Sequence, residues 1–164
     1  MLDLGTFTAI HTILSLVAIV AGVGAVRELF GRPMHAAWTF TFLVTAVLTS
    51  ATGYGFPFTA ILPSHIVGAV ALVILVVLIA ARWGFRLAGV WRPVYAVSMV
   101  ASEYLLVFVL VAQAFKRVPF LHDLAPTQTE PAFAIAQVLV LGLFGWLGFR
   151  ATRRFGASAA ARAA

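Results

Sequence analysis

Long apolar runs, separated by short segments rich in charge, glycine or proline, dominate the chain. Five of these runs approach the length of about 20 residues that an α-helix needs to cross a bilayer. They predict helices at residues 5–26, 36–52, 63–81, 93–115 and 131–149. Proline at the start of the last three suits a first helical turn, and "GYGFPF" ends the second run. The pattern predicts an all-α fold, a polytopic membrane protein built as a five-transmembrane-helix bundle.

The composition agrees with a bilayer environment. Hydrophobic residues make up 63% of the 164 residues and charged residues 10%, whereas a soluble domain is nearer half apolar and a quarter charged. We expect one transmembrane domain over residues 1–156 and a disordered C-terminal tail over 157–164, because "GASAAARAA" is of low complexity. No basic residue precedes the first apolar run, so we predict a retained helix and not a cleaved signal.

Basic residues are concentrated on one side of the predicted bundle. The first and third connections and the C-terminal segment hold all of them except Lys116 and Arg117, which lie on the opposite side. Since positive charge is retained in the cytoplasm, the bias predicts the N-terminus outside and the C-terminus in the cytoplasm. An odd number of helices fits this bias.

Several classes of function are excluded or disfavoured. The absence of cysteine excludes disulfides, iron–sulfur clusters and thiolate-bound zinc. A net charge of +6 does not indicate nucleic-acid binding, because the basic residues lie at helix ends without interleaved exposed aromatics. The sequence has no metal-hydrolase spacing, nucleophile elbow or phosphate loop, so we assign no catalytic residues.

Polar side chains gather in the predicted outer third of the bundle, where we place His11, His65, Gln113 and Gln137. Small residues share the faces of both histidines, which indicates that the rings point into the bundle. One interpretation is hydrogen bonding that fixes helix register. A second is a single b-type haem with His11 and His65 as its axial metal ligands. A third is a quinone whose carbonyls bind a histidine and a glutamine.

Glu103 lies near the middle of the fourth predicted helix, where an ionised acid costs a few kcal/mol. It can be a neutral acid hydrogen-bonded to Ser98, Ser102 or another helix, a proton-relay or coupling-ion site, or a contact with a partner subunit. The fourth connection, residues 116–130, is polar and rich in proline, and its "TQTEP" motif can cap the fifth helix. This connection can dock a partner, cover the polar layer, or only join two helices.

Four segments carry a resemblance to a known family. They are "HTILSLVAIVAG", "VLTSATGYGFPF", "PSHIVGAVALV" and "YLLVFVLVAQAFKRVPFLHDLAPTQTEPAF". The chain resembles a family of small, uncharacterised bacterial inner-membrane proteins, which implies a multi-pass protein of the bacterial inner (plasma) membrane and no established activity. The resemblance implies that relatives often have an apolar residue in place of Glu103 and an asparagine in place of Leu106. Histidines in the first and third helices give a looser architectural likeness to four-helix membrane cytochromes that carry haem b.

These observations favour a non-catalytic accessory or structural subunit of a larger membrane complex, respiratory or photosynthetic, with the lipid bilayer and other membrane subunits as its partners. The first alternative is an electron-transfer protein that holds haem b or a quinone between His11 and His65. The second is a proton-coupled channel or transporter centred on Glu103.

Overall fold

The protein is helical throughout, in a computed structural model that describes residues 3–31, 35–56 and 63–163. Its elements are α1 (Leu4–Glu28), α2 (Ala36–Thr52), a 3-10 turn η1 (Gly53–Gly55), α3 (Pro63–Ile79), a π-helical turn η2 (Ala80–Gly84), α4 (Trp91–Arg117), a short α5 (Pro119–Leu124) and α6 (Pro131–Ala163). Within these ranges, five helices are long and apolar enough to cross a membrane. The predicted all-α, five-span fold is therefore confirmed.

The helix boundaries follow the punctuation of the sequence. The bounds of α2 match the prediction, and Pro63 and Pro131 begin α3 and α6. The third helix passes into the π-helical turn η2 before it ends, and α5 lies inside the connection that was predicted as a loop. Since α6 is helical to Ala163, it extends well beyond the predicted end at residue 149. The domain division at residue 157 and the disorder beyond it stay predictions.

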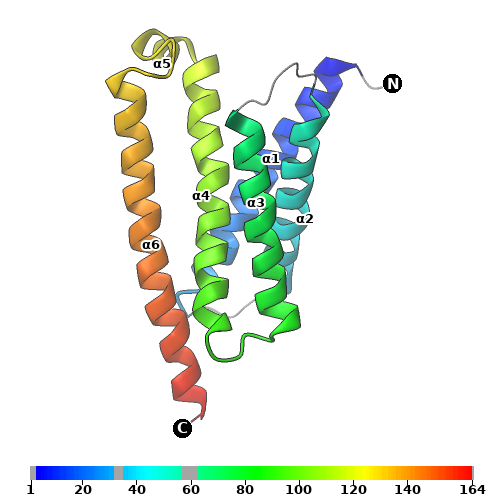
Figure 1. The fold of residues 1–164 in the computed structure, drawn as a ribbon, viewed down its shortest axis with the longest axis vertical. Helices are drawn as coiled ribbons and strands as arrows, with labels where there is room; N and C mark the ends of the chain where they lie inside the picture. Colours follow the sequence, from blue (N-terminus) through cyan, green and yellow to red (C-terminus); the bar gives the residue numbers. More distant parts are fainter. Residues whose placement is uncertain (1–2, 32–34, 57–62, 164) are drawn as a thin grey trace.

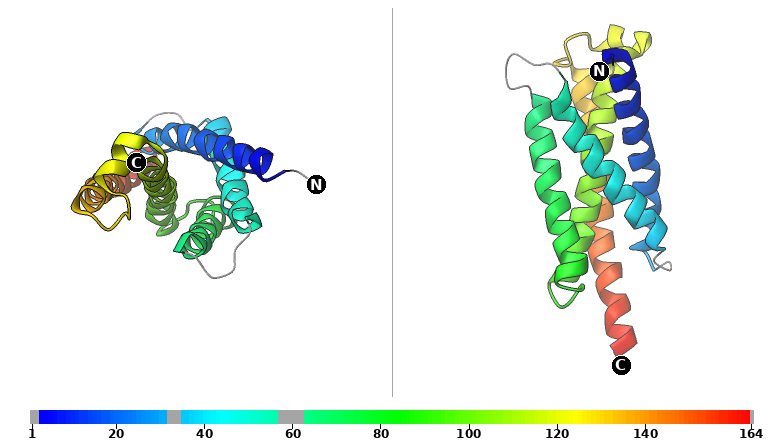
Figure 2. Two further views of the ribbon diagram at one scale, coloured as in Figure 1. Left: turned by 90° about the horizontal axis from the view of Figure 1, so that it is seen from above. Right: turned by 90° about the vertical axis from the view of Figure 1, so that its right-hand side faces the viewer.

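Helices α1–α4 form an up-and-down bundle, and α6, the fifth of the long helices, stands outside it (Figure 1). α1 packs on α2 and α4, and α3 packs on α2 and α4, so that α1–α4 close a ring, while α6 packs along α4. Figure 2 shows the same order from above, with α6 at the edge beside α4. The fold therefore leaves most of the surface of α6 uncovered by the rest of the chain.

The core occupies one half of the bundle. The buried part of α1 begins at Ala18, and the buried side chains of α3 lie near its C-terminal end. Ala18, Ala21, Gly22 and Ala25 let the neighbouring helices approach α1 closely. The opposite half is only partly buried, because its side chains are half-buried or exposed along the first half of α1 and of α3. The bundle is thus tight at one end and looser at the other.

The two ends differ in charge. The tight end carries the end of α1, the turn between α3 and α4, and the second half of α6 (Figure 1). We call it the arginine-rich end, since its described residues include Arg27, Arg82, Arg86, Arg92, Arg150, Arg153 and Arg154. We call the opposite end, which carries α5, the α5 end. The chain termini lie at opposite ends (Figure 1); the assignment of either end to the cytoplasm stays a prediction.

Candidate functional site

His11 lies at the α5 end and is half-buried against the end of α2. Its Nδ1 is 2.8 Å from the hydroxyl oxygen of Thr52. The ring of Phe56 meets the imidazole edge-on, with centroids 5.2 Å apart. His11 therefore links α1 to the segment where α2 passes into η1.

His65 lies in the first turn of α3 and contacts a different residue of the same segment. The ring of Tyr54 stacks on the imidazole with centroids 5.5 Å apart. The Tyr54 hydroxyl donates a 2.6 Å hydrogen bond to the backbone carbonyl of His65. A β-carbon at position 68 would lie 3.3 Å from the Tyr54 ring, so Gly68 provides room for this ring. His65 thus links α3 to η1, as His11 links α1 to the end of α2.

The two glutamines lie on the other side of the bundle. Gln137 on α6 is buried, and its amide nitrogen donates a 3.1 Å hydrogen bond to the carbonyl of Phe108 on α4. Gln113 is exposed and accepts a hydrogen bond of 3.4 Å from Arg117 on its own helix. The predicted polar layer is therefore divided into a part around α2 and η1 and a part between α4 and α6.

These contacts bear on how a haem would fit. α2 packs on both α1 and α3, and Figure 2 shows it between them at this end. His11 contacts Thr52 and Phe56, while His65 contacts Tyr54. Both rings thus contact side chains of the segment at the end of α2, and hydrogen bonding between helices requires no change in these contacts. Among the described residues, no group of three or more histidine or acidic side chains is placed to hold a metal ion.

The connection between α4 and α6 is ordered by Glu130. Its Oε1 accepts hydrogen bonds from the Thr127 backbone N–H (3.2 Å) and hydroxyl (2.9 Å), and its Oε2 accepts one from the Thr129 N–H (3.0 Å). Desolvation raises the pKa of Glu130, but the hydrogen bonds from its own backbone, Thr127 and Thr129 outweigh this and hold the pKa below its ordinary value. The motif closes the turn before α6, as its sequence suggests.

Glu103 is the most deeply buried acid among the described residues, with 1% of its surface exposed. Neither carboxyl oxygen has a hydrogen-bond partner, and the hydroxyl of Ser102 also lacks one. The side chain lies against Gly22 of α1 and beside Phe42 of α2. Hydrogen bonds from Ser98 or Ser102, which the sequence allowed, are thus not formed in this structure.

A cavity of about 440 Å³ opens beside Glu103, between α1, α4 and α6. Its walls are apolar and aromatic, and two arginines line it together with the acid. The lining residues are Val23, Val26, Arg27, Phe30, Glu103, Phe144, Trp146, Leu147 and Arg150. The guanidinium of Arg150 lies over the Trp146 ring, 5.4 Å from its centroid. The cavity therefore combines a long apolar wall, a buried acid and two cations.

A polar cluster at the arginine-rich end was missed by sequence reasoning. Glu28, the last residue of α1, is buried and accepts a 2.7 Å hydrogen bond from the backbone N–H of His35. Tyr95 is buried nearby, with the Arg82 guanidinium 5.7 Å from its ring centroid. An acid at a helix C-terminus opposes the helix dipole. The position of Glu28 at the end of α1 was therefore the sequence signal that its carboxylate binds a specific partner.

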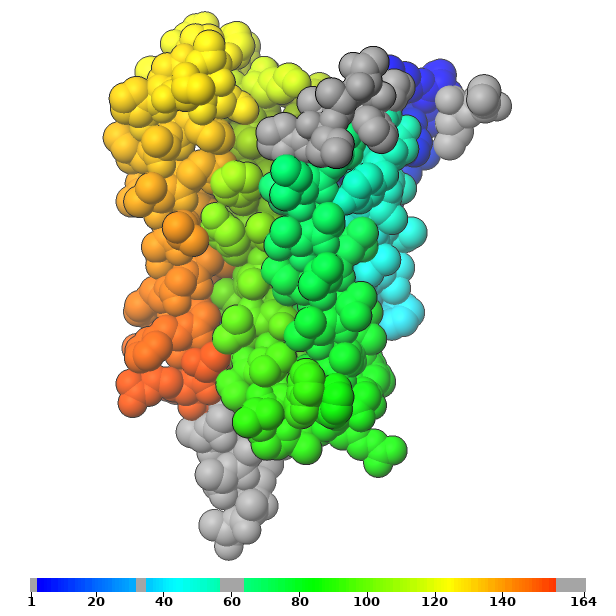
Figure 3. Space-filling view, in the orientation of Figure 1, coloured from blue at the N-terminus to red at the C-terminus, as the bar shows by residue number. Residues whose placement is uncertain are grey.

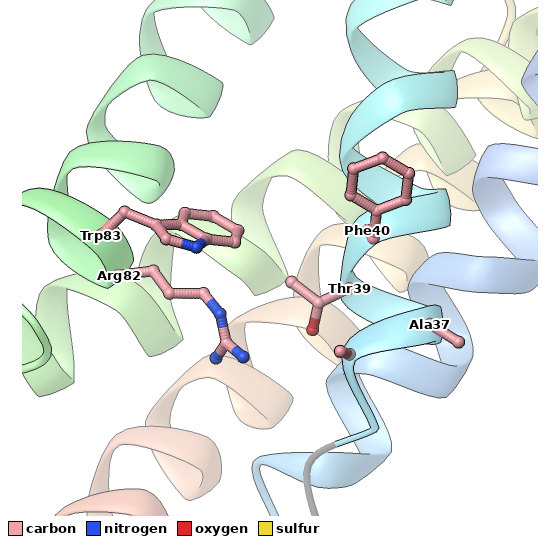
Figure 4. A pocket seen from close by; sticks show the side chains of 6 residues that line it. Ala37, Thr39, Phe40, Arg82 and Trp83 are labelled. Carbon is pink, nitrogen blue, oxygen red and sulfur yellow. The ribbon is translucent and has the colours of Figure 1, made fainter.

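A second cavity, of about 320 Å³, lies beside this cluster between α2 and the end of α3. Figure 4 shows Arg82 and Trp83 reaching from η2 towards Thr39 and Phe40 on α2. The Arg82 guanidinium is also 5.3 Å from the Trp83 ring centroid. Both cavities thus carry arginine and tryptophan, the pair expected where a membrane protein meets the interface.

Comparisons of the chain with protein-family models, curated proteins and solved structures give no match. The five long apolar helices define a polytopic, α-helical membrane protein. This architecture agrees with the bacterial inner-membrane family that the motifs resemble, and membership of that family stays a prediction.

Proposed function

We propose that the protein is a non-catalytic accessory subunit of a larger complex in the bacterial inner membrane, respiratory or photosynthetic, and that α6 is its docking helix. The observation that carries this proposal is the position of α6, which packs along α4 at the edge of the bundle. Figure 3 shows α6 forming one margin of the molecule from the α5 end downward. The outward face of α6 is accessible to a neighbouring membrane subunit between residues 131 and 155.

The outward face of α6 has the pattern of a helix–helix interface. Ile135, Val138 and Phe149 are 60%, 65% and 59% exposed. Gly142 and Gly145 complete the same stripe at spacings of three and four residues, and a β-carbon at either glycine would meet nothing within 4 Å. Apolar side chains flanking small residues at this spacing support close packing of a transmembrane helix from another subunit.

Site-specific photo-crosslinking in cells tests this docking face. A crosslinking residue at position 145 should give one product of defined mass, whereas the same residue at position 73, exposed on α3, should give lipid adducts only. Gly142→Leu should abolish the product from position 145, while Val73→Leu should leave it unchanged. A product whose mass is twice that of the chain would identify a second copy, and identical patterns at positions 145 and 73 would refute the proposal.

The electron-transfer alternative rests on His11 and His65, and on Gln113 and Gln137 for a quinone. His11 contacts Thr52 and His65 contacts Tyr54. These contacts favour a role in joining helices and do not favour a haem shared by the two rings. The proton-coupled alternative rests on Glu103, a buried intramembrane acid that lines a cavity. Proton flux into liposomes that is lost in Glu103→Gln would support that alternative over the accessory role.

A further inference from the structure

The cavity between α1, α4 and α6 combines apolar walls with an acid and two arginines. Its walls come from three helices and are formed by aliphatic and aromatic side chains, among them Val23, Phe144 and Leu147. The cavity is open to the outer surface of the bundle, since Val23 and Trp146 on its wall are 49% and 55% exposed. An apolar chain fills it without requiring hydrogen bonds from the walls.

Glu103 lines this cavity with its carboxyl oxygens buried against Gly22 and beside Phe42, so a hydrogen bond to a bound lipid requires the carboxyl group to turn towards the cavity. It is 1% exposed, it lines the cavity, and both of its oxygens lack partners within the chain. In hydrocarbon the ionised form costs a few kcal/mol, which favours the neutral acid. A neutral carboxyl group donates one O–H hydrogen bond and therefore needs an acceptor such as an ester carbonyl.

Arg27 and Arg150 supply the charge at one end of the cavity. Both are exposed and both line it. Glu28 does not neutralise them through a contact in the cavity, because its Oε1 binds the backbone N–H of His35. Basic pockets between transmembrane helices bind the phosphate groups of anionic lipids. The charge of the cavity thus favours an anion at the arginine-rich end.

The spacing of the acid and the arginines matches a phospholipid. Glu103 touches α1 at Gly22, five residues before Arg27, which is about 7.5 Å of helix rise. In a glycerophospholipid the ester carbonyls lie deeper in the bilayer than the phosphate. A phosphate between Arg27 and Arg150 therefore places an ester carbonyl at the depth of Glu103 and its acyl chain along the apolar wall.

We propose that this cavity binds one anionic glycerophospholipid, with Arg27 and Arg150 on its phosphate and Glu103 on an ester carbonyl. A lipophilic cation is disfavoured by the two arginines. The site is independent of the docking face proposed for α6, since Arg150 and Leu147 face the cavity while Gly142 and Gly145 lie in open space.

Native mass spectrometry of the full chain in a mild non-ionic detergent tests the site. The probes are phosphatidylglycerol and phosphatidylcholine with the same acyl chains, and inorganic phosphate. We expect one phosphatidylglycerol to bind more tightly than phosphatidylcholine. Arg150→Gln should weaken phosphatidylglycerol binding about fivefold, the effect of one basic residue near a membrane surface. Arg153→Gln is the matched control, because Arg153 lies over Phe149 and does not line the cavity.

The acid is tested separately from the arginines. Glu103→Leu should weaken both lipids alike, because both carry the ester, whereas Glu103→Gln keeps an N–H donor and should retain binding. If Arg150→Gln and Arg153→Gln weaken phosphatidylglycerol binding equally, the preference for this lipid comes from general surface charge, and the proposal is overturned. Equal affinity for the two lipids, or displacement of bound lipid by inorganic phosphate, would also overturn it. If Glu103→Leu fails to fold, the comparison of Arg150→Gln with Arg153→Gln still decides, since both change exposed side chains.

Discussion

Gly22 on α1 lies directly against the carboxyl group of Glu103 on α4. A β-carbon at position 22 would overlap Oε2 of Glu103 and approach the ring of Phe42 within 2.9 Å. The absence of a side chain on α1 is therefore what allows an acid to be buried at this crossing. The small residue and the acid form one structural unit, although 80 residues of sequence separate them.

Gly22→Ala should destabilise the protein, because the added methyl group has no room. Overpacking of a well-packed core costs about 1–3 kcal/mol. Glu103→Ala should relieve most of this cost in the double variant, so that the two substitutions are strongly non-additive. Gly142→Ala is the control, since its β-carbon would enter open space. The measurement is the free energy of unfolding in detergent of the wild type, the two single variants, the double variant and the control. Additive effects of Gly22→Ala and Glu103→Ala would contradict the contact.

Glu103→Leu should stabilise the delipidated protein. The carboxyl oxygens have no partners in the chain, and a buried unsatisfied polar group costs about 1–3 kcal/mol. Glu103→Gln has nearly the same shape but keeps an unpartnered polar group, so it should give no such gain. Thermal unfolding midpoints of the two variants in lipid-free detergent make the comparison. Equal stabilisation of the Gln and Leu variants would show that the charge, which both remove, and not the missing partner sets the cost.

The sequence predicts the helices well because their ends depend on local signals. Proline at positions 63 and 131 begins α3 and α6, and the bounds of α2 are set by the charged "RELFGRP" segment before it and "GYGFPF" after it. The π-helical winding of η2 has no such signal, because Arg82 and Gly84 in "AARWG" indicate that the helix ends there but not how its last turn is wound. Local chemistry thus fixes where helices stop more reliably than how their last turn is wound.

Tertiary placement was harder to predict, because hydropathy does not distinguish lipid from protein as the covering of a helix. α6 is as apolar as the bundle helices, yet it packs along α4 at the edge. The sequence predicts one polar layer because His11, His65, Gln113 and Gln137 lie at similar depth. In the structure the two histidines contact the segment at the end of α2, and the two glutamines contact α4. Depth follows from sequence position and helix rise, while neighbours depend on the packing order of the helices.

The contact of His11 with Thr52 should contribute little to stability and be measurable by a double-mutant cycle. Hydrogen bonds between membrane helices average about 0.6 kcal/mol. Thr52→Val and His11→Phe should therefore each destabilise the protein, with a coupling energy of about that size. Thr8→Val is a control, because the Thr8 hydroxyl bonds the Leu4 carbonyl within α1. A coupling energy of zero would show that the 2.8 Å contact contributes nothing between the helices.

The same histidines make the optical spectrum informative. Since Thr52, Tyr54 and Phe56 contact the two rings, we expect protein expressed with haem available to show no bands of a six-coordinate b-type haem. The reduced-minus-oxidised spectrum of protein purified in mild detergent is the measurement. Sharp visible bands that disappear in both His11→Ala and His65→Ala would establish the electron-transfer function instead. They would also require the α2–η1 segment to adopt another arrangement when haem is bound.

Thr127 should control the protonation of Glu130. The hydrogen bond from the Thr127 hydroxyl, 2.9 Å long, helps to hold the pKa of Glu130 below its ordinary value. Thr127→Val removes this donor and should raise the pKa towards the ordinary value, while Thr127→Ser keeps the hydroxyl and should leave it low. Side-chain carboxyl NMR titration in micelles measures both variants. Equal pKa values in the two would contradict the assignment.

The sign of the accompanying pH effect follows from the direction of this shift. A carboxyl group whose pKa is lower in the folded state binds protons more weakly there than in the unfolded state. The capped turn before α6 is therefore stabilised at pH values above the unfolded pKa, and this stabilisation is lost as the pH falls through the folded pKa. The Thr127 and Thr129 N–H groups bond the carboxylate, so their protection from hydrogen exchange, relative to the intrinsic rate at each pH, should fall over that range. In Thr127→Val this loss of protection should be complete at a higher pH, because the folded pKa of Glu130 is then closer to its unfolded value.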